Sequence, residues 1–299
     1  KVQQYYSEKY GVTHPTKPGL KIPQMFDAAI NKELKAVWII GEDIVQTDPN
    51  SAHVIEAMES LEFLVVQEIF MSETAKLATV VLPGTTFLEK DGTFTNTERR
   101  IQRVNRAAPP LPGTKPDGVI VAEMMQRFGF KQPDYNADQV LKEIADVVPF
   151  FKGVTRERLG AYGLQWPVEE DGTDTKILYK ETFKLGKGQL KNFDWKESTE
   201  IETNQKEYPL ILTTSRALQH YNCGTMTRRT SNIDIMDEDI LLIHPTDAAE
   251  RDLITGDFGR LYSGRGKVDL KVEVTDKVKK GVVFTTFHFP EHMVNMVTG

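Results

Sequence analysis

The sequence has 299 residues, of which 39% are hydrophobic and 27% charged, a composition typical of soluble globular domains with a real core. A net charge of −6 argues against a nucleic-acid partner bound through a general basic surface. Because Cys223 is the one cysteine, the chain cannot form an internal disulfide or hold an iron–sulfur cluster by itself. No apolar run reaches the roughly 18 residues of a membrane-spanning helix, so the sequence predicts no membrane span.

The first predicted strand is the apolar run at residues 36–40, which follows a predicted amphipathic helix at residues 22–34. A strand that is apolar throughout is typical of a parallel sheet buried on both faces, and ligands bind beyond the carboxyl ends of such strands. The candidates at this end are Gly41, Glu42, Asp43 and Thr47. A carboxylate there can accept hydrogen bonds from a ribose diol or a guanine edge. Alternatively, polar residues here cap the next helix: Asp48, Asn50 or Ser51.

Two further strands repeat this pattern. Apolar runs at residues 61–66 and 79–82 each end at polar residues or glycine, and a short helical stretch lies between them, which predicts a βαβαβ unit. Right-handed crossovers place all three strand ends along one edge of the sheet. A nucleotide along that edge would meet Asp43, Thr47, Gln67 and Gly84. The sequence lacks a GxGxxG motif here, so NAD binding is not indicated.

Residues 89–106 are charged and contain a turn signal, Asp91-Gly92. Their four arginines either face phosphates or an acidic partner or, as is commoner, form a solvated face: Arg99, Arg100, Arg103 and Arg106. A strongly periodic helix begins at Asp117 and ends before Gly129. Spacing alone favours Asp117 as the cap of this helix over a ligand-facing carboxylate. Further helices are predicted at residues 137–147 and 155–159.

The pattern changes towards the C-terminus, where several short strands and one helix after Pro245 predict a closed β-barrel. These strands are predicted at residues 209–213, 240–243, 258–262, 267–274 and 281–287. The chain therefore divides into an α/β domain at residues 1–150, a connector at 151–204 and a barrel at 205–299. We expect the connector to be helical or extended, with some β structure, and to be packed without forming a core.

The segment TSRALQHYNCGTMTRRT at residues 214–230 directly follows the first barrel strand. It concentrates side chains that can bind phosphate or the edge of a heteroaromatic ring, among them Arg216, His220 and Asn222. A donor-rich loop after a buried strand is a common place for an anionic ligand. A solvated polar loop is the alternative, and His220 could equally be a hydrogen-bonded core histidine.

Three segments of the barrel together resemble the C-terminal domain of molybdopterin-dependent formate dehydrogenase catalytic subunits: SRALQHYNCGTMTRRTSNI, HPTDAAERDLITGDFGRLYSGRGKV and KKGVVFTTFHFPEHMVNMVTG. Upstream, GEDIVQTDPN, the long stretch from VVQEIF to RRIQRV, and KPDGVIVAEMMQRFGF resemble the preceding domain of the same enzymes. The resemblance runs from about residue 36 to the end, in the order of this dimethyl-sulfoxide-reductase-type family. It implies a partial Rossmann-like three-layer domain, N-terminally incomplete, and a small closed barrel of the double-psi type that lacks its last strand.

The resemblance also implies a cofactor: molybdopterin guanine dinucleotide, in its bis form, with Mo or W. It would lie beside an iron–sulfur cluster that receives the electrons when formate is oxidised to CO2. The positions that match cofactor-binding residues are Gly41, Glu42, Asp43, Thr47, Gln67, Gly84, Asp117, Arg216, His220, Asn222 and Phe287. Asp117 would accept from a guanine, the Arg216 segment would contact pterin or phosphate, and Phe287 would lie near the pterin. Cys223 does not match the metal ligand, and we expect a structural role for it.

Several features of the resembled enzymes are missing: the N-terminal Cys-rich cluster motif, the metal-ligating cysteine or selenocysteine, and the upstream catalytic His and Arg. With its start at KVQQYYSEKYG, the chain is therefore expected to be a C-terminal fragment or one piece of a split subunit, inactive alone. Expected partners are the missing N-terminal half, electron-transfer subunits and the substrate pair formate/CO2, in the cytoplasm. The alternatives are a related enzyme such as a nitrate reductase, or a non-catalytic scaffold subunit that retains the fold.

Overall fold

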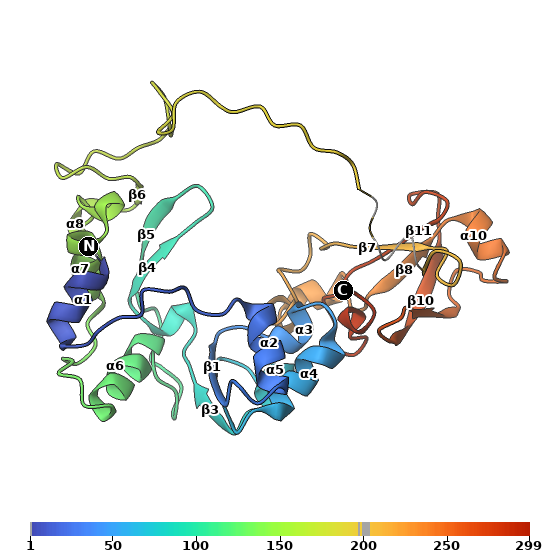
Figure 1. The fold of residues 1–299 in the computed structure, drawn as a ribbon, viewed down its shortest axis with the longest axis horizontal. Helices are drawn as coiled ribbons and strands as arrows, with labels where there is room; N and C mark the ends of the chain where they lie inside the picture. Colours follow the sequence, from blue (N-terminus) through green and yellow to red (C-terminus); the bar gives the residue numbers. More distant parts are fainter. Residues whose placement is uncertain (1, 197, 199–203) are drawn as a thin grey trace. The chain divides into compact units, whose positions relative to one another are not determined.

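The computed structural model describes residues 2–196, 198 and 204–299, and its fold is mixed α/β, as predicted (Figure 1). Contacts divide the chain into two compact units. Unit 1 comprises Lys1–Gly19 and Leu82–Asn192, and unit 2 comprises Leu20–Val81 and Phe193–Gly299. The predicted domain boundaries do not coincide with these units and stay predictions about sequence organisation. Of the helices that the structure describes, none is long and apolar enough to cross a membrane.

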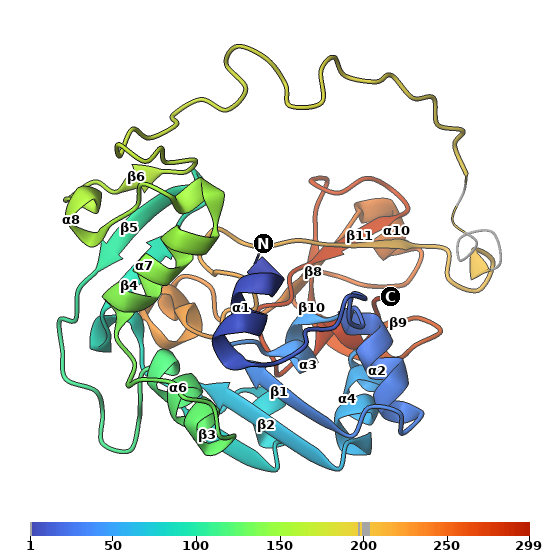
Figure 2. The same cartoon turned by 60° about the vertical axis from the view of Figure 1, so that its left-hand side comes forward.

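The α/β part of unit 2 has the predicted alternation of helices and strands. In chain order its elements are α2 Ile22–Ile30, β1 Ala36–Ile40, α3 Ile44–Thr47, α4 Ser51–Ser60, β2 Phe63–Glu68, α5 Glu73–Lys76 and β3 Val80–Pro83, whose last two residues are assigned to unit 1. The strand order is β1-β2-β3, and β1 and β2 are parallel in a register that pairs Ile40 with Gln67 (Figure 2). The βαβαβ prediction is therefore confirmed in element order, and the carboxyl ends of β1 and β2 lie side by side.

A single apolar cluster holds this sheet and its helices together. Val54 and Ala57 of α4 are fully buried, as is Val66 of β2, and Leu64 is 2% exposed. The residues on α4 are three apart and those on β2 two apart, which are the spacings that put side chains on one face of a helix and of a strand. The polar residues after β1 are therefore set at the edge of a rigid core.

The C-terminal part of unit 2 is a five-stranded sheet in the order β7-β11-β8-β10-β9. Its strands are β7 Ile211–Thr214, β8 Ile240–Ile243, β9 Phe258–Tyr262, β10 Lys267–Val274 and β11 Val282–Thr285, with helix α10 Pro245–Ala249 after β8. β7/β11 and β8/β10 are parallel pairs, whereas β8/β11 and β9/β10 are antiparallel. The inward residues of β10 are buried in strict alternation at Val268, Leu270 and Val272, as the period of two predicted.

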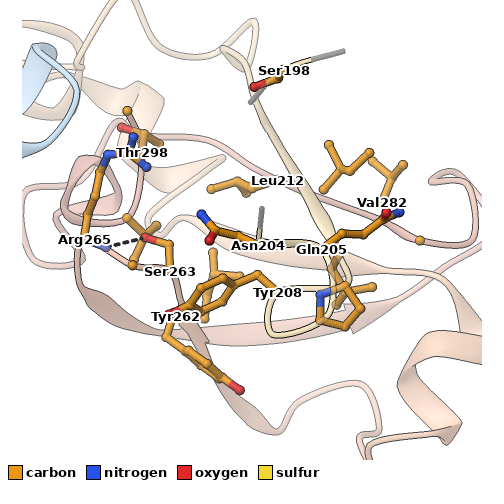
Figure 3. A pocket seen from close by; sticks show the side chains of 18 of the residues that line it. Ser198, Asn204, Gln205, Tyr208, Leu212, Tyr262, Ser263, Arg265, Val282 and Thr298 are labelled. Atoms are coloured by element: carbon orange, nitrogen blue, oxygen red, sulfur yellow. Dashed lines mark hydrogen bonds between the residues drawn. The ribbon is translucent and has the colours of Figure 1, made fainter. Parts of the chain in front are cut away.

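The two end strands of this sheet flank a cavity. Within the described part of the chain, β7 is hydrogen-bonded to β11 alone and β9 to β10 alone. A pocket of about 640 Å³ lies along both free edges (Figure 3). Tyr208 and Tyr262 approach each other across it, with ring centroids 5.8 Å apart, and the last residues, up to Gly299, line it as well. The sheet is thus curled, with a groove between its end strands.

Unit 1 contains a β-hairpin that the sequence analysis missed. β4 Gly92–Thr95 and β5 Arg100–Val104 are antiparallel, and β6 Leu164–Gln165 adds a third strand. The charged residues of β5 hide its pattern, because Ile101 is its one fully buried side chain. The helices of unit 1 are α1 Val2–Tyr10, α6 Asp117–Arg127, α7 Ala137–Val147 and α8 Arg156–Leu159. The last three confirm the predicted helices, whereas α1 was not predicted.

The connector differs from its prediction at one point. Every residue from 181 to 196 is exposed, with no helix or strand among them, so this stretch is extended but not packed. Leu185 and Leu190 are 95% and 102% exposed. Because Gly186, Gly188 and several lysines separate its apolar residues, the stretch has no continuous apolar face to bury.

Short 3₁₀ helices complete the structure: η1 Phe87–Glu89, η2 Pro149–Phe151, η3 Thr227–Arg229, η4 Ser231–Asp234 and η5 Val294–Met296.

Candidate functional site

The candidate site in unit 2 begins at the end of β1. The amide of Gly41 donates to the carbonyl of Gln67 at 2.9 Å, which continues the β1/β2 ladder by one residue. Gly41 has φ +64°, a backbone conformation that residues with a Cβ rarely adopt. The chain can therefore turn sharply here and place the next acidic residues beyond the sheet edge.

Asp43 is buried and is engaged within the fold. Its Oδ1 accepts from the amide and hydroxyl of Thr74 at 2.9 and 2.7 Å, and its Oδ2 accepts from the amide of Glu73 at 3.3 Å. These amides belong to the first turn of α5, where a carboxylate is favoured by the helix dipole. Asp43 thus fastens the end of β1 to α5. Its predicted contact with a cofactor stays a prediction.

Thr47 lies between two further carboxylates. Its Oγ1 is 3.1 Å from Oε1 of Glu42, 3.4 Å from Oδ2 of Asp48 and 3.0 Å from the carbonyl of Asp43. Burial raises the pKa of Asp48, and the nearby charge of Glu42 raises it further, against the lowering effect of the Thr47 hydrogen bond. Glu42 is exposed, so this end of the sheet offers acceptors to a ligand that carries N–H or O–H donors.

The second half of the site is the Arg216 loop, which we define as residues 215–224, directly after β7. Arg216 is exposed, and its guanidinium carbon lies 5.1 Å from the centre of the Phe287 ring, a cation–π distance. No carboxylate in the described part of the chain forms an ion pair with Arg216. Asn222 is exposed, and it adopts a left-handed conformation, φ +49°, that asparagine tolerates well. Arg216 and Asn222 are therefore exposed in this loop, and their contact with a ligand stays a prediction.

His220 is buried, and both of its ring nitrogens have partners. Nε2 donates to the carbonyl of Met236 at 2.8 Å, so Nδ1 can accept from the hydroxyl of Thr227 at 3.0 Å. The same Thr227 oxygen accepts from the amide of Tyr221. These contacts fit the alternative of a hydrogen-bonded core histidine, and a direct ligand contact of His220 stays a prediction.

Two residues that the sequence analysis did not single out hold this loop. Asp239 is fully buried just before β8 and accepts from the Thr286 hydroxyl and from the amides of His288 and Phe289, both at 3.0 Å. It thereby fixes the segment Thr286–Phe289, which we call the His288 turn. His288, also fully buried, accepts at Nε2 from the amide of Ala217 at 2.8 Å and donates from Nδ1 to the carbonyl of Asn222 at 2.7 Å. Both ends of the Arg216 loop are thus anchored on one imidazole.

The protonation of His288 should make the stability of the chain depend on pH. Burial lowers the pKa of His288; His220 and Arg216 lower it too, while the Asn222 carbonyl and Asp239 oppose them. As pH falls below about 6.5, the unfolded chain gains a proton on this residue before the folded chain does, so folding stability drops. Between pH 7.5 and 5.5, we expect the melting temperature of wild type to fall further than that of His288→Gln, whose amide can still donate and accept. An equal fall in both proteins, measured by calorimetry, would contradict this.

The halves of the site meet inside unit 2. Gln46, which precedes Thr47, donates to the carbonyls of Cys223 and Phe287. Helix α3, which follows β1, and the Arg216 loop are therefore in direct contact. Cys223 itself is buried, with its Sγ 3.1 Å from Oγ1 of Thr225. Residues 2–196, 198 and 204–299 contain no group of three or more His, Cys, Asp or Glu side chains that could hold a metal ion.

Two predicted residues, Gly84 and Asp117, lie in unit 1. Gly84 forms a bridge with Lys115, just before Asp117. Asp117 is ion-paired with Lys90 in the first turn of α6, but the N-cap position is Pro116 and no side chain caps the helix. The prediction that Asp117 caps this helix is therefore wrong; proline at the N-cap shifts the aspartate one position into the helix.

The arginine cluster of unit 1 is largely engaged within the fold. Arg99 donates to the carbonyls of Trp166, Thr175 and Lys176, and Arg100 pairs with Glu98 at 3.2 Å. For these two arginines the structure favours hydrogen bonding inside the unit over contact with phosphates.

Comparisons with known proteins identify the family. Residues 2–127 match the family model "Molybdopterin oxidoreductase", and residues 210–299 match "Molydopterin dinucleotide binding domain". The F420-dependent formate dehydrogenase subunit alpha of Methanocaldococcus jannaschii is 42% identical over 284 residues, which is 94% of this chain. The F420-dependent formate dehydrogenase 2 subunit alpha of Methanococcus maripaludis is 42% identical over 286 residues, again 94% of this chain. The chain spans 42% of the length of each relative.

A solved structure has the same fold. Acetylene hydratase from Pelobacter acetylenicus aligns with a TM-score of 0.68 and 20% identity, over 100% of this chain and 45% of that protein. Identity at this level supports the fold alone. Together with the two family models and the relatives among formate dehydrogenase alpha subunits, it leads to one conclusion: the chain belongs to the molybdopterin oxidoreductase family and carries that family's dinucleotide-binding domain at its C-terminal end.

Proposed function

We propose that this chain is the C-terminal, cofactor-binding portion of a formate dehydrogenase catalytic subunit and that it binds molybdopterin guanine dinucleotide. The two relatives named formate dehydrogenase subunit alpha support this, because they align with almost the whole chain. Since the chain spans 42% of each of them, the oxidation of formate to CO2 belongs to the complete subunit. This portion would position the cofactor, and we do not expect it to turn over formate alone.

The observation that carries the proposal is the exposed guanidinium of Arg216. The chain has 43 acidic residues, yet among the described residues none forms an ion pair with this arginine. A guanidinium that is held on an aromatic ring and keeps its N–H groups available is suited to bidentate contact with a phosphate. We assign Arg216 to the phosphate or pterin of the cofactor, with Asn222 as a second contact and Phe287 beside the pterin.

The strand ends fit the nucleotide end of the same cofactor. Glu42 and Thr47 present polar atoms beyond β1, which suits the donors of a ribose diol or a guanine edge. Gly41 and Gln67 shape this edge through their shared ladder bond. Because the side chains of Asp43 and His220 are already hydrogen-bonded inside the fold, we propose that they hold the walls of the site in place.

In unit 1 we propose that Asp117 accepts from a guanine and that Gly84 keeps the end of β3 open for it. Asp117 is half-buried beside Lys90, next to a pocket of about 280 Å³. Such a volume suits a purine base, and a carboxylate matches the paired N–H donors of guanine.

When bound, a pair of these pterins would supply Mo or W as the acceptor of two electrons from formate. We propose that an iron–sulfur cluster in the other part of the subunit receives the electrons and passes them to electron-transfer subunits. This arrangement is consistent with a chain that has one cysteine. We place the enzyme in the cytoplasm.

We further propose that the five-stranded sheet belongs to a closed barrel of the double-psi type that lacks its last strand in this chain. The edges of β7 and β9 that no described strand pairs with support this, since an extended segment in the pocket between them would pair with both (Figure 3). Paired edges would also remove two aggregation-prone surfaces.

The test is to purify the complete subunit and the 299-residue chain from a host supplied with molybdate or tungstate. Metal content by mass spectrometry and pterin content by oxidation to fluorescent derivatives should show the cofactor in the complete subunit, which should oxidise formate. The 299-residue chain should show no formate oxidation. A complete subunit without pterin dinucleotide would refute the proposal, and one without metal or activity would favour the scaffold alternative.

A further inference from the structure

Gln46 occupies an unusual position between the two halves of the site in unit 2. It lies in α3, the short helix that begins after Asp43 and ends at Thr47, and it is 3% exposed. The sequence gives no reason to single it out, because a glutamine in a short helix is normally solvated. Its burial therefore calls for a role in the contacts that surround it.

The side-chain nitrogen of Gln46 bridges two separate segments. Nε2 donates to the carbonyl of Cys223 at 2.9 Å and to that of Phe287 at 3.2 Å. Cys223 belongs to the Arg216 loop and follows Asn222, while Phe287 belongs to the His288 turn. One amide group thus ties two ligand-facing segments to the helix that carries Thr47.

The backbone of Gln46 is held from a third direction. Asn295 is also buried, and its Nδ2 donates to the carbonyls of Gln46 and Thr47 at 2.8 and 3.2 Å. These contacts leave the end of α3 little freedom to move relative to the five-stranded sheet. The backbone of Gln46 is therefore fixed while its side chain bridges the two segments.

The side-chain oxygen of Gln46 indicates which role of this residue matters. Oε1 of Gln46 is buried, and no donor among the described residues reaches it. A buried acceptor without a partner opposes folding. Glutamine offers two N–H donors without a charge, which lysine and arginine cannot do in a buried place. The arrangement is explained if the two donors matter more than the unsatisfied oxygen.

We propose that Gln46 is a positioning residue for the cofactor site: it sets the distance between Thr47 at the end of α3 and the Asn222 and Phe287 side chains beside the five-stranded sheet. Without this bridge, water forms hydrogen bonds with the carbonyls of Cys223 and Phe287. The Arg216 loop and the His288 turn then move independently of α3. The effect on the cofactor rests on the proposed function, whereas the effect on the loops does not.

The experiment compares Gln46→Met, which keeps the volume and removes both donors, with Ile44→Ala, a cavity in the same helix. Ile44 is 7% exposed and contacts neither loop through a hydrogen bond. Hydrogen exchange in the 299-residue chain should be faster at residues 222–224 and 286–289 in Gln46→Met than in wild type. In Ile44→Ala these amides should exchange as in wild type, although both variants melt at lower temperature.

In the complete subunit, Gln46→Met should release the pterin cofactor about tenfold faster than Ile44→Ala, the size expected for an outer-shell partner. Equal exchange of the two loops in both variants, or cofactor release that follows melting temperature alone, would overturn the proposal. If the complete wild-type subunit contains no pterin dinucleotide, the proposed function fails, and the exchange data still decide whether Gln46 positions the loops.

Discussion

Replacing Asp239 by alanine should lower the free energy of unfolding by about 3–5 kcal/mol, the range of a buried, charge-assisted network that loses its centre. The carboxylate accepts from the Thr286 hydroxyl and from the amides of His288 and Phe289. All three donors lie in buried residues, so water cannot replace the lost acceptor without opening the turn. Thermal or urea unfolding of the 299-residue chain, followed by circular dichroism, measures the effect.

Two variants make this result specific. Asp239→Asn keeps the volume and one acceptor, so its loss should be smaller than that of the alanine variant. Asp269→Ala removes a carboxylate from the same sheet, but this carboxylate pairs with Arg260 in an exposed position, where solvent screens the pair and its contribution to stability is small. Equal losses in Asp239→Ala and Asp269→Ala would show that the buried network does not stabilise the turn.

The sequence predicts those parts of the fold that depend on local periodicity. The strands at residues 240–243, 258–262 and 267–274 agree with their predicted limits, because the alternation of VDLKVEV and the apolar run ILLI are unambiguous. The hairpin of β4 and β5 was missed because its strands carry mainly charged and polar residues around one buried isoleucine, Ile101. Its position depends on packing within unit 1 that the pattern does not express.

The candidate site divides in the same way. Arg216 and Asn222 stand out in the sequence because their loop concentrates donors. Gln46 does not, since its partners lie 177 and 241 residues away along the chain. Asp239 was hidden among three acidic residues in the segment MDEDI, and only the fold decides which of them is buried. Exposed donors that cluster in one loop are thus easier to single out from a sequence than the buried residues that hold the loop.

Replacing Arg216 by alanine in the complete subunit should lower the affinity for the pterin cofactor by about 10- to 100-fold, because a hydrogen bond to a charged group is worth about 1.5–3 kcal/mol. The alanine variant loses both the proposed phosphate contact and the cation–π contact with Phe287. Arg216→Lys keeps the charge but not the planar fork, so its affinity should fall between wild type and alanine. Metal and pterin content of the purified enzymes measures the occupancy.

The matched control for Arg216 is Arg260→Ala, an exposed arginine on β9 of the same sheet whose guanidinium is already bonded to Asp269 at 2.7 and 2.8 Å. Because that guanidinium is neutralised by its partner, its loss should leave the cofactor content unchanged. The folded chain should tolerate Arg216→Ala equally well, since an exposed side chain without an ion pair adds little to stability. Normal metal and pterin content in Arg216→Ala, at wild-type melting temperature, would remove Arg216 from the cofactor site and with it the observation that supports the function proposed for this chain.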